Sequence, residues 1–161
     1  MASSTPTLGA DLGLTRYTGF ASSVVLDVAD SWGGVDLAVG AAGRGVPGHR
    51  GGDDLTTVSE RANLGQALIM RLLTPLGTLG PLGHADYGSR LVELVGRLND
   101  EATRNLARLF TIQAVAAERR AQLVRLEVSV PPGQPGTVRI DLVVLPIGQD
   151  EPLALGLEVA L

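Results

Sequence analysis

The chain has 161 residues, a formal net charge of −4 and no cysteine. Its length suits a single hydrophobic core, and the missing cysteines exclude disulfides, thiolate nucleophiles and cysteine metal sites. The negative charge argues against general nucleic-acid binding, which requires a basic face. Hydrophobic residues make up 45% of the chain and aromatic residues only 3%. We therefore expect a core of Leu, Val, Ile and Ala.

Residues 1–11 lack the basic segment and following apolar run of a secretory signal. No stretch of the chain approaches the roughly 18 apolar residues that span a bilayer. We therefore expect a cytoplasmic protein without a membrane span.

Residues 1–55 are predicted to form an N-terminal extension. Segments 24–28 and 35–39 have the composition of short strands joined by a glycine-containing turn. Residues 40–54 are rich in glycine, which makes the segment costly to order, so we expect a mobile loop there. Residues 56–161 are predicted to form the main domain.

Three helices are expected in the main domain. The first begins at Thr57, because Thr57 and Glu60 have the spacing of a capping box, and it ends at Pro75 and Gly77. Its apolar residues lie on several sides, with one face formed by Leu64, Ala67, Leu68 and Leu72 and further apolar surface from Ile69, Met70 and Leu73.

The next two helices are predicted from apolar stripes at helical spacing. The stripe of the second helix is Leu91, Leu94, Val95 and Leu98. The third helix is expected to begin at Asn99 or Asp100, either of which can cap it, and to end near Arg120. The stripe of the third helix is Ala102, Leu106, Leu109, Phe110, Ala114 and Ala117.

Residues 121–161 alternate apolar and polar side chains with a period of two, which is typical of strands. The three apolar sets are Val124, Leu126, Val128 and Val130; Val138, Ile140, Leu142 and Val144; and Leu153, Leu155, Leu157, Val159 and Leu161. Loops at 131–136 and 148–152 separate them. The predicted fold class is α+β, with three helices packed on a small antiparallel C-terminal sheet and an N-terminal extension.

The last of these strands is apolar on both faces, and Glu158 is its one charged residue. At the edge of a sheet such a strand invites pairing with another chain. We expect a partner to complete that edge by β-augmentation. The alternative is that the strand lies inside the sheet and only ends the chain.

Small-molecule and metal sites find little support. Residues 43–48 read G-x-G-x-x-G, but residues 49–52 (His-Arg-Gly-Gly) cannot readily start the helix that a pyrophosphate requires. His49 and His84 have no second ligand at i+3 or i+4. Ser89 lies outside any G-x-S-x-G elbow. We expect neither a cofactor nor a metal.

A glycosidase requires two carboxyl groups, and the candidates are Asp86, Glu93, Glu101 and Glu118. Arginines neighbour Glu93 and Glu118 in the sequence. They lower the pKa of a carboxyl group, whereas a general acid needs a raised pKa. We therefore expect no catalytic residues. On the residues alone, the arginines of Glu118-Arg119-Arg120 are explained as cations at a helix C-terminus.

Three segments together resemble a known family. They are Asn63-Leu64-Gly65-Gln66-Ala67-Leu68, Arg71-Leu72-Leu73-Thr74-Pro75-Leu76-Gly77 and Leu82-Gly83-His84-Ala85-Asp86-Tyr87-Gly88-Ser89-Arg90-Leu91. They resemble the baseplate wedge or sheath-initiator family of contractile phage tails, also called the lysozyme-related tail family, over roughly residues 54–161. The motif turn of that family corresponds here to Thr74, Pro75, Gly77, His84, Asp86, Tyr87, Gly88 and Ser89. Its form is most similar to members from extracellular contractile injection systems.

The family also carries Glu-Pro-Arg after its third helix, and Glu118-Arg119-Arg120 is similar, with Arg119 in place of the proline. The resemblance implies that these three residues bind wedge proteins and that the strand at 153–161 binds sheath subunits. It further implies a structural component present in six copies per baseplate, with the central hub or inner tube as another partner. Such a protein is made in the cytoplasm and assembled into a phage-tail-like particle.

Two other classes of function stay open. One is a peptidoglycan hydrolase that uses Asp86, Glu93 or Glu118, and the other is a small-molecule binder that uses the loop at residues 40–54. A hydrolase requires two converging carboxylates, and a binder orders its glycine-rich loop around a ligand. An assembly protein requires an exposed strand edge.

Overall fold

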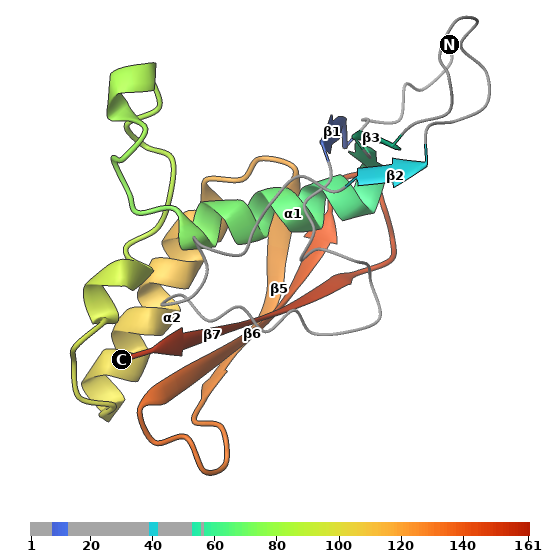
Figure 1. Ribbon diagram of the computed structural model, residues 1–161. Coiled ribbons are helices and arrows are strands. Elements are labelled where there is room, and N and C mark those ends of the chain that lie inside the picture. The colour runs from blue at the N-terminus through green and yellow to red at the C-terminus, as the bar shows by residue number, and fades with distance from the viewer. Residues whose placement is uncertain (1–7, 13–38, 42–52, 56) are drawn as a thin grey trace, which may run out of the picture.

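The computed structural model describes residues 8–12, 39–41, 53–55 and 57–161 (Figure 1). Its elements in chain order are β1 (Ala10–Leu12), β2 (Val39–Ala41), β3 (Asp53–Leu55), β4 (Thr57–Ser59), α1 (Glu60–Leu73), the 3₁₀ turns η1 (Gly80–Leu82) and η2 (Leu91–Leu94), α2 (Glu101–Ala116), β5 (Ala121–Ser129), β6 (Thr137–Pro146) and β7 (Leu153–Ala160). The α+β class is confirmed, but the described residues form two α-helices where the sequence predicted three.

The C-terminal sheet has the strand order β5-β6-β7, and both pairs are antiparallel. The central strand β6 buries every second side chain, and its buried set is the predicted one: Val138, Ile140, Leu142 and Val144. In β7 the predicted apolar face is also buried from Leu153 to Val159, and Leu161 is half-buried after the strand ends. Among the described strands β7 pairs with β6 alone, so it lies at the edge of the sheet that they form.

The first strand of the sheet departs from its predicted alternation at Val124, and it ends at Ser129, so the predicted Val130 lies beyond it and is 41% exposed. Leu123 pairs with Val144 and Arg125 pairs with Val143, so Val124 is an extra residue in a β-bulge. The side chain of Val124 is 59% exposed, while Leu123, Leu126 and Val128 are directed to the core. The bulge reverses the face of the residues before it, which an unbroken period of two cannot represent.

The two α-helices share one core with the sheet. α2 packs along β5, and α1 contacts both α2 and β7. The predicted core positions of α1 are confirmed, since Leu64, Leu68 and Leu72 are buried together with Ile69 and Leu73. α1 ends at Leu73, two residues before Pro75. The ring nitrogen of Pro75 carries no hydrogen and cannot donate to the helix.

The predicted capping box at the start of α1 is wrong. Thr57 belongs to β4, which pairs with β1, and the helix begins at Glu60. The backbone N–H of Glu60 donates to the carbonyl of Gly9 at 3.0 Å. A backbone carbonyl from a distant segment therefore supplies the partner that the sequence assigned to a threonine hydroxyl.

The predicted second helix is also wrong. Only the 3₁₀ turn η2 forms, and it buries Leu91 and Leu94. Val95 takes an extended conformation and Gly96 has a φ of +83°, so the chain leaves the turn and exposes 82% of Leu98. A 3₁₀ turn places residues i and i+3 on the same side, as an α-helix does, so the first half of the stripe could not distinguish the two.

The start of α2 is as predicted, and its buried face agrees in part: Phe110 and Ala114 are buried and Leu106 packs against the core. Asp100 caps the helix by accepting from the N–H of Thr103 at 2.7 Å. The helix ends at Ala116, earlier than the expected end near Arg120. The buried residues are Thr103, Ala107, Phe110, Thr111, Ala114 and Val115, whereas the predicted Ala102, Leu109 and Ala117 are exposed. Small residues allow close packing on β5, and the buried Thr111 hydroxyl donates to the carbonyl of Ala107.

The N-terminal extension is described only in part. The predicted strand at 24–28, most of the strand at 35–39 and residues 42–52 of the predicted loop lie outside the described residues. β2 and β3 pair with each other at the two ends of that loop. Leu8 is only 2% exposed and belongs to the hydrophobic core. None of the helices within the described ranges is long and apolar enough to cross a bilayer.

Candidate functional site

The motif turn is closed at its base by hydrogen bonds between its two ends. The N–H of Ser89 donates to the carbonyl of Thr74, and the N–H of Leu76 donates to the carbonyl of Ser89, both at 2.8 Å. The Ser89 hydroxyl donates to the carbonyl of Leu72 at 2.5 Å, and the Thr74 hydroxyl donates to that of Met70 at 2.7 Å. Both hydroxyls therefore fasten the turn to the end of α1.

Gly88 allows the two ends of the turn to approach each other. A Cβ atom on Gly88 would lie 2.6 Å from the Thr74 carbonyl oxygen and 2.9 Å from the carbonyl carbon and oxygen of Pro75. Its φ of +116° is also unfavourable for any residue with a side chain. The Thr-Pro and Tyr-Gly-Ser parts of the motif are thus two halves of one backbone junction.

Between those ends, residues 75–88 project from the body of the molecule (Figure 1, light green). Gly77, His84 and Asp86 lie in this projection and are exposed. Leu82, in η1, is 73% exposed at the same projection. Tyr87 instead turns back to the body, where the guanidinium carbon of Arg71 lies 4.4 Å from the centre of its ring.

The junction between α2 and β5 carries the second predicted element. Arg120 binds both carboxylate oxygens of Glu118, through Nε at 2.8 Å and Nη2 at 3.1 Å. The Arg120 backbone N–H donates to Glu118 Oε1 at 3.2 Å. Glu118 is buried, whereas Arg119 is exposed and Arg120 is partly exposed. Of the predicted wedge-binding residues, only the two arginines are available to a partner.

Electrostatic interactions link the motif turn to this junction. Burial raises the pKa of the Tyr87 hydroxyl; the positive charges of Arg71 and Arg120 act to lower it, and the negative charge of Glu118 acts to raise it. Burial also acts to raise the pKa of Glu118, but the hydrogen bonds and charge of Arg120, together with Arg71, outweigh it and lower that pKa. Nε of Arg71 is buried and has no hydrogen-bond partner among the described residues. The structure thus brings together two elements that the sequence suggested separately.

The four candidate acids do not have the surroundings that a general acid requires. Glu93 forms two hydrogen bonds of 2.7 Å with Arg90, which lower the pKa of Glu93. Glu118 is held ionised by Arg120. Asp86 is exposed in the projecting loop, and Glu101 is exposed in the first turn of α2. A general acid requires a raised pKa, which neither Glu93 nor Glu118 has.

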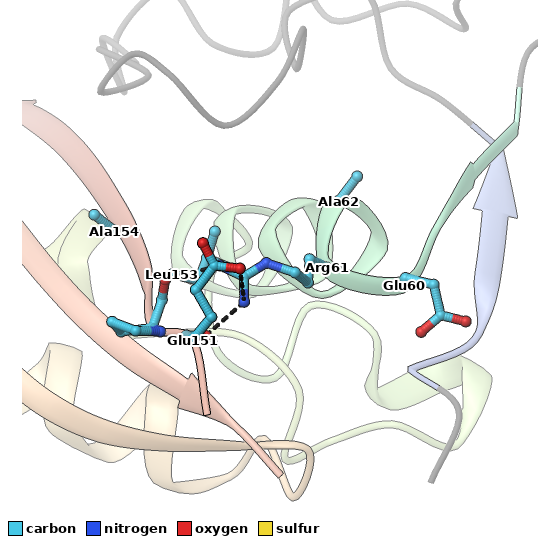
Figure 2. Close-up of a pocket in the computed structure, with 7 residues that line it drawn as sticks. Glu60, Arg61, Ala62, Glu151, Leu153 and Ala154 are labelled. Carbon is cyan, nitrogen blue, oxygen red and sulfur yellow. Dashed lines mark hydrogen bonds and ion pairs between the residues drawn. The ribbon is translucent and has the colours of Figure 1, made fainter. Parts of the chain in front are cut away.

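A pocket of about 520 Å³ lies between the start of α1 and the start of β7 (Figure 2). Arg61 crosses it, donating to the carbonyls of Glu151 and Pro152 and pairing with the Glu151 carboxylate at 3.5 Å. Glu60, the other acid in the lining, points away from Glu151 (Figure 2). Arg61 therefore ties α1 to the turn before β7. No group of three or more potential metal ligands occurs in the part of the chain that the structure describes.

The outer edge of β7 is the most extended candidate surface. Leu153, Leu155, Leu157 and Val159 are buried against the helices, so the strand is held firmly by its side chains. On the other face, Glu158 pairs with Arg139 of β6 at 3.3 Å. Among the described residues, no strand pairs with the edge of β7 opposite β6.

The fold has a counterpart among solved structures. A protein of Geobacter sulfurreducens that carries the provisional name tail lysozyme matches with a TM-score of 0.54 and 18% sequence identity, over 62% of this chain and 88% of that chain. The two proteins share a fold. A scan against family models and a search of curated proteins found no match for this chain.

Two parts of the site had no clear signal in the sequence. Arg71 was placed on the motif's helix, but nothing indicated that it would stack on Tyr87. Leu8 lies far from any recognised motif, yet its carbonyl accepts a hydrogen bond from Nη1 of Arg120 at 2.9 Å. An arginine that follows a helix can bind any carbonyl brought near it, so only the three-dimensional arrangement identifies its partner.

Proposed function

We propose that this protein is a structural baseplate component of a contractile, phage-tail-like injection system, and that it links wedge proteins to the first ring of sheath subunits. The observation that carries the proposal is the open edge of β7. We further propose that the protein is made in the cytoplasm and assembled there in six copies per baseplate. The match in fold to a protein named as a tail lysozyme supports a role in a phage tail.

The edge of β7 has the properties that β-augmentation requires. The strand runs over eight residues without a bulge, and its alternate side chains are anchored in the core. An incoming strand would therefore meet a rigid row of backbone donors and acceptors. Apart from Glu158, β7 lacks the charges, prolines and bulges that usually protect such an edge.

The Glu118–Arg120 junction supports a second contact, but with divided roles. Glu118 is buried and bound by Arg120, so we assign it to positioning the Arg120 side chain. Arg119 and the exposed part of Arg120 would then meet the wedge proteins directly. Replacement of the family's proline by Arg119 adds a cation at this surface, which favours an acidic partner.

Exposed apolar side chains in the motif turn, around η2 and on α2 also support an assembly role. Large hydrophobic residues are exposed in the projecting loop, around η2 and on α2: Leu76, Leu82, Val92, Val95, Leu98, Leu109 and Ile112. Single exposed apolar residues are ordinary, but a collection over adjoining elements is typical of a surface that meets another protein.

The proposal is tested by blocking the β7 edge without removing a core side chain. Ala160→Pro removes a backbone donor near the end of β7, and Val124→Pro at the bulge of β5 is the matched control. Each full-length variant is co-expressed with the sheath, tube and wedge proteins of the injection system. Electron microscopy is expected to find baseplates without sheath for Ala160→Pro and sheathed particles for Val124→Pro. Sheathed particles from a folded Ala160→Pro variant would overturn the sheath contact.

A parallel assay separates assembly from hydrolysis. Purified protein is incubated with peptidoglycan beside Glu93→Gln and Glu118→Gln variants. The structural proposal expects no release of soluble fragments by any of the three. Lysis by the wild type that either variant abolishes would replace the structural proposal with the hydrolase alternative.

A further inference from the structure

The segment Leu8–Leu12 lies in a site formed by distant parts of the chain. Leu8 is 2% exposed and fills a place in the core. Its carbonyl accepts two hydrogen bonds at 2.9 Å, one from Nδ2 of the buried Asn63 in α1 and one from Nη1 of Arg120. Two side-chain donors from separate elements thus converge on one backbone oxygen.

The rest of the segment is held in the same manner. Its strand pairs with β4, with Leu12 opposite Thr57. The next carbonyls are also occupied, since that of Gly9 accepts from the Glu60 N–H at 3.0 Å and that of Leu12 accepts from Gln66 Nε2 at 2.8 Å. The body of the protein therefore presents donors and a strand edge, and the segment supplies carbonyls and one leucine.

The site is fitted to the sequence of the segment that fills it. Gly9 has a φ of +82°, and a Cβ atom there would lie 3.2 Å from Nδ2 of Asn63, so the residue after the buried leucine has to be small. A buried leucine, a glycine of positive φ and a short strand together form the ligand of a groove whose donors come from Asn63, Gln66 and Arg120 and whose strand edge is β4. Every copy of this protein carries that ligand beside its own groove.

We propose that this groove can bind the Leu8–Leu12 segment of a second copy in place of its own. Neighbouring copies would then exchange their N-terminal segments. The exchanged arrangement contains the same hydrogen bonds and the same buried leucine as the closed one. Its cost is therefore mainly the entropy of association, which falls when copies are held close together. The inference does not depend on the proposed baseplate function.

A groove left empty would be unfavourable, which favours exchange over simple release of the segment. Asn63 is 5% exposed, and departure of Leu8 would leave its amide without that acceptor in a buried position. The apolar place of Leu8 would also be open to water. A copy whose own segment has left the groove is therefore stabilised when it binds the segment of a neighbour.

The chain contains no cysteine, so exchange can be trapped by a disulfide between copies. Leu12 and Thr57 are directly opposite in the β1–β4 pair, at a separation that a disulfide can bridge. Full-length Leu12→Cys and Thr57→Cys proteins, carrying different mass tags, are mixed and oxidised. Non-reducing mass spectrometry is expected to find linked heterodimers at least about tenfold more often than for a control mixture of Leu12→Cys with Gln122→Cys on β5.

Two further variants make each outcome decisive. A single chain with both Leu12→Cys and Thr57→Cys is expected to close internally, which verifies that the pair can form a bond. Adding Leu8→Asp to the Leu12→Cys copy should reduce the heterodimer yield about tenfold or more, because the buried place cannot accept a charge. Internal closure in the single chain with no excess of heterodimers over the control mixture would overturn the proposal. Heterodimers that are insensitive to Leu8→Asp would overturn it equally, since they would form without the groove.

Discussion

The two edges of the C-terminal sheet differ in how they treat an incoming strand. β5 is interrupted by the bulge at Val124, and its exposed face carries the ion pair of Arg125 with Glu127 at 2.8 Å. β7 pairs with β6 in unbroken register and has one charged side chain, Glu158. Bulges and charges are the usual means of protecting an edge. The β5 edge therefore carries features that protect against further strands, and the β7 edge carries few of them.

The difference between the two edges indicates that a further strand could be added only beside β7. α2 packs along β5, which further restricts that side, while β7 contacts α1 and has no partner on its outer edge among the described strands. A sheet with two open edges could add strands at both sides and continue without limit. A protected β5 edge would restrict any addition to the β7 side.

The largest effect is expected from proline within the open edge strand. Leu157→Pro removes a buried side chain and a backbone donor and fixes φ, so the free energy of unfolding should fall by about 3 kcal/mol or more. Val124→Pro lies at a bulge, where proline is tolerated, and should change it by less than about 1 kcal/mol. Urea denaturation followed by circular dichroism measures both. Equal losses would mean that the two edges are equally ordered.

Deletion of Val124 should convert the protected edge into an open one. Without this residue, Leu123 and Leu126 still face the core and Arg125 still faces solvent, so the strand regains an unbroken period of two. We expect the deletion variant to fold and to associate at protein concentrations where the wild type does not. Sedimentation velocity measures this association. A folded deletion variant that sediments as the wild type does would show that the bulge is not what protects β5.

A single charge on the open edge should weaken partner addition without affecting the fold. Ala154→Lys places a cation at an exposed position of β7, and Val124→Lys places one at an exposed position of β5. We expect about tenfold weaker capture of sheath subunits for the first variant and unchanged capture for the second. Melting temperatures of both should stay close to that of the wild type. A pull-down with purified sheath subunits measures capture, and equal capture by the two variants would remove the distinction between the edges.

The smallest effect concerns the ion pairs on the solvent face of the sheet. Arg139 of β6 binds Asp141 at 2.8 Å and Glu158 of β7 at 3.3 Å. Arg139→Met should lower the free energy of unfolding by at most about 1 kcal/mol, because these side chains are only partly buried and water still screens the pairs. Arg125→Met, which removes the pair on β5, should have no measurable effect. A loss in Arg125→Met as large as that in Arg139→Met would mean that the pair with β7 contributes nothing specific.

How well each element could be predicted from the sequence depended on how that element packs. β6 is the central strand, so both neighbours fix its register and its alternation in the sequence matches its burial. The cap at Asp100 was predictable because the partner, the N–H of Thr103, is local. In β5 the predicted alternation holds at Leu126 and Val128 but fails at Val124, since a bulge depends on the partner strand, and at Val130, which follows the end of the strand. Leu98 and Leu109 are apolar and lie at helical spacing, as core residues do, but both are exposed. Only the tertiary contacts determine that they lie outside the core.

The candidate site divides in the same way. The sequence identified the motif turn and the charged junction but could not place them next to each other, because Tyr87 and Glu118 meet only through the packing of α1 against α2. Glu118 was expected at a binding surface and is buried under Arg120. The contribution of Leu8 was not predicted, since a single leucine in a glycine-containing segment carries no periodicity.

The closed base of the motif turn has a consequence for how this protein can change over evolutionary time. Because Thr74, Gly88 and Ser89 fix the two ends of the loop, the residues between them can be lengthened or replaced without altering the distance that the core has to span. Each doubling of the length of such a loop costs only about 0.6 kcal/mol of closure entropy. Insertions should therefore accumulate in the projection around Leu82, where contacts with a different protein can arise while the scaffold stays the same.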